Sequence, residues 1–463
     1  MHIRKIQIEN IRCFGAGERG VHLDLSRPDG SLAGWTVFAG RNGTGKTTLL
    51  QAIALCLTGP SEARQLLPSF STWLRGGARE GKVDIEFEFD DASLGEILPG
   101  SGGRFEAALF WERNGGREPV LQFRGPSIEE GVTGKAELLG PWKWDADRWF
   151  WCGYGPGRRL GGASIVPERG ASHKIGRVAT LFDEEKSLVE GLDWLRELYS
   201  DRLDLAERAR NADASRKSEL ERLAAELRVL QENVIGLLND GLLRDGMRVV
   251  EFNREGLWVE QGGVSLALHQ LSGGSRSVVA LVFDILRRMH ECFGELRIEH
   301  DKEHNVITVP YEGVILIDEI ESHLHVSWQQ SIGFWLKRHF PNVQFLVTTH
   351  SPFVCQAADP NGLVRLAAPG EKRSTEIMPE ETYLRVVNGG PDDAVLTDLF
   401  GLETVYSESA EELRSRISRL DVKLIRGTAT AEEKEERDHL VKMLPGGGSA
   451  MVEQTLRKLE ALG

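Results

Sequence analysis

The feature that most restricts the fold is a glycine-rich segment between a predicted strand and a predicted helix. Residues 40–47 read GRNGTGKT and fit the pattern GxxxxGK[ST]. The apolar run from Trp35 to Ala39 precedes them, and a helix is expected from Lys46 to about Thr58, where Gly59-Pro60 ends it. Glycines let successive backbone N–H groups surround a phosphate. The order strand, loop and helix therefore predicts a phosphate-binding loop (P-loop) in an α/β domain.

The ligand expected in this loop is ATP with Mg²⁺. The Lys46 ammonium group would reach the β- and γ-phosphates, and the Thr47 hydroxyl would bind Mg²⁺. The N-terminus of the helix adds a partial positive charge. The residues predicted to bind the nucleotide are Gly40, Arg41, Asn42, Gly43, Thr44, Gly45, Lys46, Thr47 and Thr48. The alternative is a glycine-rich turn without function, which the strand and the helix on either side disfavour.

A second apolar run, Val314–Ile317, ends in two acids, Asp318 and Glu319. We expect this run to be a strand beside the P-loop strand in a parallel sheet. Asp318 would hold Mg²⁺, directly or through water, and Glu319 would orient and deprotonate the attacking water. The other interpretation is a strand that ends in solvated acids.

Two further segments are candidates for the same chemistry. The predicted strand Gln344–Thr349 ends in His350, which either donates a hydrogen bond to the γ-phosphate or has a structural role. Ser272 is a good helix N-cap, and Gly273 and Gly274 expose N–H groups, so this segment either binds an anion or only caps its helix. Since the chain has one P-loop and one such anion site, symmetry would give a homodimer with two ATP molecules between the subunits.

The segment from about Glu184 to Leu238 has helical periodicity. A polar break at Asn211–Ser215 divides it, and the second half carries a 3-4 repeat of apolar residues at Leu220, Leu223, Leu227, Leu230, Val234 and Leu237. The pattern predicts a helical hairpin inserted into the α/β domain. It either packs along the core or projects as a short coiled coil.

The chain is expected to have four parts. These are a lobe with the P-loop (1–183), the inserted hairpin (184–244), a lobe with Ser272, Asp318 and His350 (245–375) and a helical C-terminal region (376–463). The predicted fold class is α/β, with a parallel-sheet core and additional antiparallel strands. A polar hairpin at about 295–309 lengthens the connection between Ser272 and Asp318.

Composition excludes several classes of protein. No apolar run of about 18 residues exists, so no membrane span is expected. Five scattered cysteines without CxxC spacing argue for a reducing cytoplasm and against a zinc site or a disulfide framework. The formal net charge of −14 disfavours unassisted DNA binding, although a local basic patch remains possible.

The order of these motifs is that of ABC ATPases, and LSGGSRS resembles their LSGGQ signature, with Ser275 in place of glutamine. DEIESHLH at 318–325, followed by Trp328-Gln329, resembles the soluble RecF/OLD-like ATPases, as do TTHSP at 348–352 and the opening IRKIQIENIRCF. Val326 stands where that pattern has proline. The resemblance implies an ABC-type ATPase head over about residues 1–180 and 245–370.

The resemblance also implies roles for particular residues. Ser272 and Gly274 would touch the γ-phosphate held by the other subunit of a head-to-tail dimer, and His350 would be the switch histidine. His323 and His325 match the D-loop, which crosses the dimer interface. The other interpretation of these two histidines is a pair of metal ligands.

The stretch GYGPGRR at 153–159 is similar to a GYGxxR element in bacterial ATP-binding proteins, including the Septu and retron-associated anti-phage ATPases. A Q-loop glutamine is missing, and residues 154–159 could occupy its place. The resemblance implies a regulatory ATPase of a defence complex whose separate effector is an HNH-type nuclease. The hairpin or the C-terminal helices would dock it, unless they pack against the head. The alternative is a RecF-like repair ATPase that clamps DNA. A transporter subunit would need membrane partners and a Q-loop.

Overall fold

The computed structural model describes residues 1–89, 104–115, 118–124, 142, 149–158, 173–186, 188, 190–244, 246–301 and 306–444. Arg159, with which the GYGPGRR stretch ends, and the predicted break at 445–448 lie outside these residues. The chain divides into two compact units, Met1–Phe400 and Gly401–Gly463. The first unit contains every predicted site residue.

A six-stranded sheet forms the centre of the first unit. Its order is β16 (Glu376–Ile377), β15 (Leu363–Arg365), β3 (Gly34–Ala39), β14 (Val343–Thr349), β13 (Gly313–Ile317) and β7 (Trp151–Tyr154). All neighbouring strands are parallel except β16, which is antiparallel to β15. Every residue of β7, β13 and β14 is buried, as in parallel sheets covered on both faces.

The strand order corrects one expectation. The strand that ends before Asp318 does not lie beside the P-loop strand, because β14 lies between β3 and β13. With seven buried residues, β14 is longer than β13, which has five. A long, fully buried strand needs hydrogen-bonding neighbours on both edges, and the position between β3 and β13 provides them.

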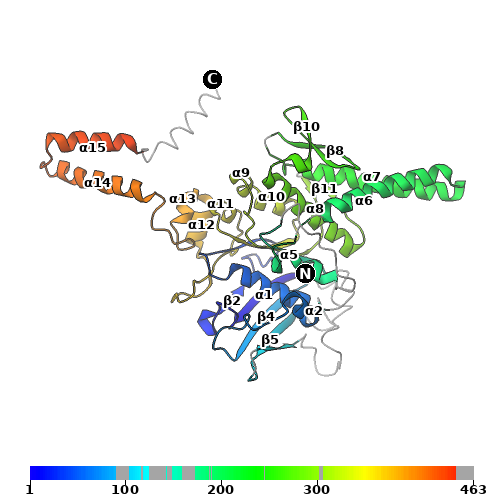
Figure 1. Cartoon of the computed structure of the whole chain (residues 1–463), viewed down its shortest axis with the longest axis horizontal. Coiled ribbons are helices and arrows are strands. Elements are labelled where there is room, and N and C mark those ends of the chain that lie inside the picture. Colours follow the sequence, from blue (N-terminus) through cyan, green and yellow to red (C-terminus); the bar gives the residue numbers. More distant parts are fainter. Residues whose placement is uncertain are drawn as a thin grey trace. The chain divides into compact units, whose positions relative to one another are not determined.

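A five-stranded antiparallel sheet packs over the same helix as the central sheet. Its order is β2 (Val21–Asp24), β1 (His2–Glu9), β4 (Glu80–Glu88), β5 (Arg104–Glu112) and β6 (Val120–Arg124). Alternate residues of β4 are buried, which is the pattern of a sheet with one covered face. Helix α1 (Lys46–Thr58) contacts strands of both sheets, and Figure 1 shows it beside β4. Only Thr47 of α1 is not buried, so the P-loop helix is fixed on all sides.

Helix α8 (Gly273–Phe293) organises a second hydrophobic core. It packs with the helices α6 (Glu190–Asn211) and α7 (Ala214–Asn239), which lie side by side in Figure 1, and with a sheet of order β10 (Val264–Ala267), β9 (Gly256–Gln261) and β8 (Arg248–Asn253). Asp284 of α8 is paired with Arg287 at 2.8 Å and with Arg288. These charges are almost fully buried and satisfy one another.

The α6–α7 hairpin combines the two arrangements that the sequence left open. Trp194, Leu195, Val234 and Leu237 are buried in the core around α8. Residues 213–219, at the other end of the hairpin, are exposed. The hairpin is therefore packed on the core at its base and open to solvent at its end.

Smaller elements connect these layers. They are η1 (Gly17–Arg19), α2 (Pro60–Leu66), α4 (His173–Gly176), α5 (Ala179–Phe182), η4 (Leu268–Gln270), β11 (Glu299–Asp301), β12 (Val306–Thr308), α9 (Val326–Gln329), α10 (Ile332–His339) and α11 (Pro352–Cys355). The antiparallel pair β11–β12 is the expected polar hairpin.

The C-terminal helices fall into both units. Helices α12 (Glu380–Asn388) and α13 (Pro391–Val395) belong to the first unit, and α14 (Glu408–Ile425) and α15 (Ala431–Met443) to the second. Ion pairs join α14 to α15, for example Arg416 to Glu436 at 2.9 Å. The four-part division of the chain stays a prediction. Within the part of the chain that the structure describes, no helix has the length and apolar character needed to cross a membrane.

Candidate active site

The predicted site residues other than those of the LSGG segment gather where four parallel strands end. In the sheet, Ala39 pairs with Thr349, and Ile317 pairs with both Val347 and Tyr154. The loops that follow β3, β14, β13 and β7 therefore meet at one edge. Ligands bind at this carboxyl edge in open α/β sheets.

The P-loop is a close turn that needs glycine at two positions. Gly43 and Gly45 have φ values of +81° and +90°, which favour glycine. A Cβ atom on Gly45 would also lie 2.3 Å from the Cys13 sulfur, so the loop packs directly on the segment after β1. Gly45 is the N-cap of α1, and its side-chain-free backbone leaves the first N–H groups of the helix available to an anion.

Lys46 lies inside this loop. Its ammonium group donates hydrogen bonds to the carbonyl oxygens of Gly40 at 3.0 Å and Arg41 at 3.2 Å. Burial lowers the pKa of Lys46, while the nearby carboxylates of Glu319 and Asp318 raise it. Lys46 is thus held at the centre of the loop and close to the acids after β13.

Asp318 is a buried carboxylate between two hydroxyl groups. It accepts hydrogen bonds from Thr47 at 2.6 Å and from Thr348 at 2.5 Å. Burial raises the pKa of Asp318, which the two hydroxyl groups partly oppose. Thr47 and Asp318 supply oxygen atoms, the ligands that Mg²⁺ prefers, and a bound cation would favour the ionised carboxylate. The pair predicted to hold Mg²⁺ is therefore brought together and fits that ion.

No group of three or more His, Cys, Asp or Glu side chains suited to a metal ion occurs among the described residues. Mg²⁺ commonly uses only one or two protein ligands together with water and substrate phosphates. Among the described residues, His323 and His325 therefore do not belong to a group of three or more side chains that could bind a metal ion.

Glu319 begins the turn after β13 in an uncommon backbone conformation. Its φ is +44°, in the left-handed region, which costs an L-residue roughly 1–2 kcal/mol. Its N–H donates to the Thr348 hydroxyl at 2.8 Å, and its carboxylate accepts from Ser322 at 3.2 Å. A strained glutamate at a ligand-binding edge is typical of a functional residue.

His350 follows β14 and is exposed at the same edge. Partial burial and the neighbouring Lys46 charge lower the pKa of His350, while Glu321, Glu319 and Asp318 oppose this shift. The lowered pKa favours the neutral imidazole, which can donate one N–H group. Lys46, Asp318, Glu319 and His350 form one electrostatic cluster.

Sequence reasoning missed Glu321. Its carboxylate accepts hydrogen bonds from the Thr349 hydroxyl at 2.7 Å and from the His350 N–H at 2.5 Å. Glu321 thereby joins the turn after β13 to the tip of β14. The only sequence signal for this role is a further acid two residues after Glu319, together with the hydroxyl pair Thr348-Thr349 at the end of the other strand.

Arg158 lies in the GYGPGRR stretch, for which the sequence predicted no role for individual residues. Its guanidinium group donates to the carbonyl oxygens of Gly155, Asp318, Glu319 and Ile320 at 2.9, 2.7, 2.8 and 2.8 Å. Burial lowers the pKa of Arg158 to about 10. The group is still charged at pH 7 and binds the backbone of the turn that contains Glu319.

The LSGG segment forms a different site. Ser272 caps α8, and its hydroxyl accepts the Ser275 N–H at 3.3 Å. Gly274 lets α8 approach the turn after β13, because a Cβ atom there would lie 2.7 Å from the His323 carbonyl oxygen. Gly273, between them, is exposed.

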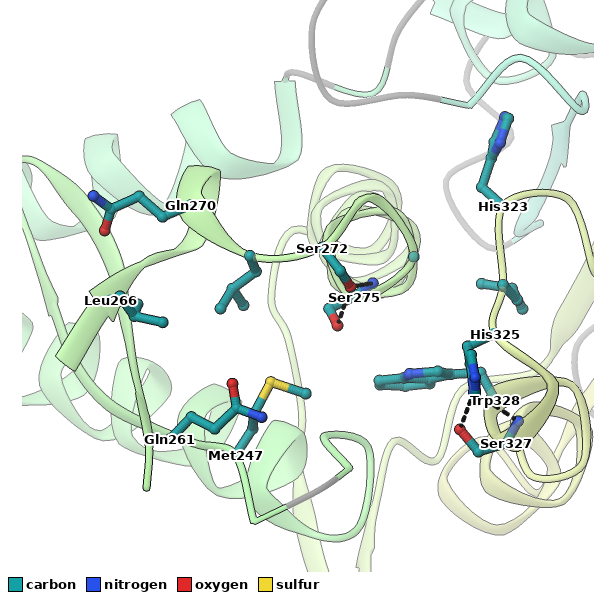
Figure 2. A pocket seen from close by; sticks show the side chains of 13 residues that line it. Met247, Gln261, Leu266, Gln270, Ser272, Ser275, His323, His325, Ser327 and Trp328 are labelled. Atoms are coloured by element: carbon teal, nitrogen blue, oxygen red, sulfur yellow. Dashed lines mark hydrogen bonds between the residues drawn. The ribbon is translucent and has the colours of Figure 1, made fainter. Parts of the chain in front are cut away.

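A cavity of about 620 Å³ opens beside Ser272 and Gly274, and its lining includes His323 and His325. Figure 2 shows Ser272 and Ser275 between two groups of side chains, with Met247, Gln261 and Leu266 on one side and His325, Ser327 and Trp328 on the other. No residue of the P-loop lines this cavity. The structure therefore joins the LSGG segment to His323–His325, not to Lys46 of the same chain.

Three relatives are similar in sequence. A Septu protein PtuA from Bacillus mycoides is 23% identical over 444 residues, which are 95% of this chain and 50% of that protein. The "Retron Ec83 probable ATPase" of Escherichia coli is 34% identical over 175 residues, 35% of this chain and 31% of that protein. The "Retron Vc95 probable ATPase" of Vibrio cholerae is 34% identical over 132 residues, 28% of this chain and 23% of that protein. The chain thus spans half or less of the length of these relatives.

Among solved structures, an Smc head bound to the C-terminal winged-helix domain of ScpA is similar to this chain. The TM-score is 0.45 at 16% sequence identity, and the alignment covers 82% of this chain and 99% of that structure.

A family model described as "AAA domain, putative AbiEii toxin, Type IV TA system" matches residues 36–356. This range begins in the strand before the P-loop and includes Arg158, the LSGG segment, Asp318, Glu319 and His350. It covers more than half of the chain. The central parallel sheet, the P-loop between β3 and α1 and the match over these residues lead to one conclusion: the chain belongs to this family of P-loop AAA ATPase domains.

Proposed function

We propose that this chain binds ATP with Mg²⁺ and hydrolyses it at the carboxyl edge of the central sheet. The observation that carries the proposal is the meeting of Lys46, Thr47, Asp318, Glu319 and His350 at that edge. A cation, a hydroxyl–carboxylate pair, a second carboxylate and an imidazole are groups that together can catalyse phosphoryl transfer to water.

Each group has a distinct part in this chemistry. Lys46 and the N–H groups of the P-loop bind the β- and γ-phosphates. Thr47 and Asp318 would hold Mg²⁺, which would neutralise charge on the phosphates. Glu319 accepts the proton of the attacking water, and the His350 imidazole donates a hydrogen bond to the γ-phosphate.

We further propose a dimer in which the LSGG segment of one subunit completes the ATP site of the other. Ser272 and Gly273 are exposed at the N-terminus of a long helix, where an anion is stabilised. The cavity at Ser272 excludes the P-loop of its own chain, which supports a nucleotide contributed by a second copy. His323 and His325, beside this cavity, would lie at the same interface.

The biological role that we propose is regulation of an anti-phage defence complex, because the chain is similar to Septu PtuA and to retron ATPases. ATP binding and dimerisation would control a separate effector, an HNH-type nuclease. The exposed end of the α6–α7 hairpin and the charged α14–α15 pair are the candidate docking surfaces.

The enzymatic part of the proposal is tested by phosphate release from ATP. The purified chain should release phosphate with Mg²⁺ present and stop when the metal is chelated. If phosphate release is no faster than in a matched blank without protein, the enzymatic assignment is wrong.

The defence role has its own test. The proposal predicts that a reading frame beside this gene encodes a nuclease. Cells that carry both genes should resist phage, and Lys46→Ala should abolish that resistance. The chain should not bind duplex DNA in a strongly salt-dependent way. Such binding by the chain alone, without phage resistance, would favour a DNA-clamping repair ATPase.

A further inference from the structure

Arg158, four residues after the end of β7, connects the segment after this strand to the turn that carries Glu319. Arg158 is 2% exposed, and its four hydrogen bonds to the described residues all go to backbone carbonyl oxygens. Three of these carbonyls belong to the consecutive residues Asp318, Glu319 and Ile320. In these contacts the guanidinium group binds the backbone of the turn and none of its side-chain carboxylates.

The turn needs such support because Glu319 has a φ of +44°. A glutamate returns to an ordinary conformation unless its surroundings hold it in the left-handed region. On the N–H side, the Thr348 hydroxyl accepts the Glu319 N–H at 2.8 Å. On the carbonyl side, Arg158 donates to the Glu319 oxygen at 2.8 Å, and the Ser322 N–H of the same turn donates to it at 2.8 Å as well. The peptide groups on both sides of the Glu319 Cα atom are therefore held.

We propose that Arg158 is a positioning residue that holds Glu319 in the conformation required for activation of the attacking water. This inference rests on the proposed function, in which Glu319 is the base. Arg158 itself would touch neither ATP nor water. Its effect is to keep the Glu319 carboxylate at one place relative to Lys46 and the γ-phosphate, and positioning errors of about 1 Å cost up to about 100-fold in rate.

Arginine is suited to this position for a geometric reason. Its planar group carries five N–H donors in a fixed fork, so it can bind several carbonyls that follow one another along a turn. A lysine ammonium group is compact and offers three donors from a single atom. Lysine would therefore keep the positive charge near Asp318 and Glu321 but lose part of the backbone contacts.

The test uses Arg158→Lys and Arg158→Gln, with Arg177→Lys as the matched control. Arg177 is also buried, donates to the Trp149 carbonyl at 3.3 Å and lies 5.5 Å from the centre of the Trp151 ring, but it does not contact the Glu319 turn in these interactions. Both Arg158 variants should lower kcat by about 10- to 100-fold. ATP affinity should change little, since the lost contacts act only on the chemical step. Arg177→Lys should leave kcat near that of the parent chain.

A double-mutant cycle separates positioning from a general structural role. In a Glu319→Gln background the base is already absent, so Arg158→Lys should cause no further loss of turnover. A structural role would lower the residual rate in both backgrounds. Amide hydrogen exchange of residues 318–324 provides a readout without ATP, and exchange should be faster in Arg158→Lys than in Arg177→Lys.

Several results would overturn the inference. They are an unchanged kcat in both Arg158 variants, an additive double mutant, unchanged exchange of the turn, or failure of both Arg158 variants to fold while Arg177→Lys folds. Lack of turnover by the parent chain would instead remove the proposed ATPase function, and the exchange experiment would still decide whether Arg158 holds the turn.

Discussion

Replacement of Lys46 tests how the P-loop recognises the nucleotide. The Lys46 side chain is buried, with 6% exposed, and its ammonium group lies within hydrogen-bonding distance of the loop carbonyls. In this position a contact to phosphate is charge-assisted and shielded from water. Such hydrogen bonds contribute about 1.5–3 kcal/mol. Since about 1.4 kcal/mol corresponds to a tenfold change, Lys46→Ala should weaken ATP binding by about 10- to 150-fold.

Removal of the Lys46 charge should not lower the stability of the folded chain. Burial lowers the pKa of Lys46, which means that the folded protein disfavours its charged form at pH 7. Lys46→Met, which keeps the apolar stem and removes the charge, should therefore melt at the same temperature as the parent chain or higher. Loss of ATP binding without loss of stability would exclude unfolding as the cause.

Isothermal titration calorimetry with Mg²⁺ and ATP measures the effect, and differential scanning calorimetry measures the melting temperature. Lys82→Ala is a suitable control, because Lys82 lies on β4 and contacts Gln7 at 3.3 Å, outside the candidate site. The reasoning would be refuted by an unchanged ATP dissociation constant in Lys46→Ala.

Three further predictions address the other parts of the site. Ser272→Arg should retain ATP binding but lose ATP-induced dimerisation and hydrolysis, as measured by light scattering and phosphate release, and mixing it with Lys46→Ala should restore some hydrolysis. Hydrolysis at the parent rate by monomeric Ser272→Arg would contradict a site completed by the second subunit. The pKa of His350 in the folded chain lies below its ordinary value of 6.5, so His350 does not affect stability above pH 6.5, and stability falls below that pH because the unfolded chain binds the proton first. The acid limb of the kcat/KM profile should lie below pH 6.5. An acid limb above pH 6.5 that disappears in His350→Asn would be inconsistent with a neutral imidazole. The two Glu321 carboxylate oxygens lie 2.7 and 2.5 Å from their donors, and Glu321→Gln replaces one of them. It should lower the melting temperature, kcat and the free energy of unfolding, the last by about 1.5–3 kcal/mol for the loss of a charge-assisted hydrogen bond. An unchanged free energy of unfolding in a urea titration would mean that Glu321 does not hold the tip of β14.

Local sequence signals predicted the main elements of the site. The helix expected over Lys46–Thr58 has those bounds in the structure, because glycines and proline mark both of its ends. The runs before Asp318 and His350 are buried parallel strands, since continuous apolar residues need cover on both faces. These signals depend on neighbours in the chain and can be read without the tertiary fold.

The remaining features depend on contacts between distant segments. The strand order could not be predicted, because the apolar character of β13 and β14 does not specify which of them lies beside β3. Arg158 binds carbonyl oxygens 160 to 162 positions along the chain, and backbone acceptors leave no mark in the sequence. Glu321 acts on the N–H of His350, which is likewise invisible to pattern analysis.

The central claim is that this chain hydrolyses ATP with Glu319 as the base. It is tested most directly by measuring the ATP turnover rate of Glu319→Gln and of the parent chain, with ATP affinity measured on the same samples. The substitution keeps the size of the side chain and removes only its capacity to accept a proton. We predict that ATP binds with unchanged affinity, that kcat falls by at least about 100-fold, and that the variant accumulates as an ATP-bound dimer. Normal turnover by Glu319→Gln would contradict the account.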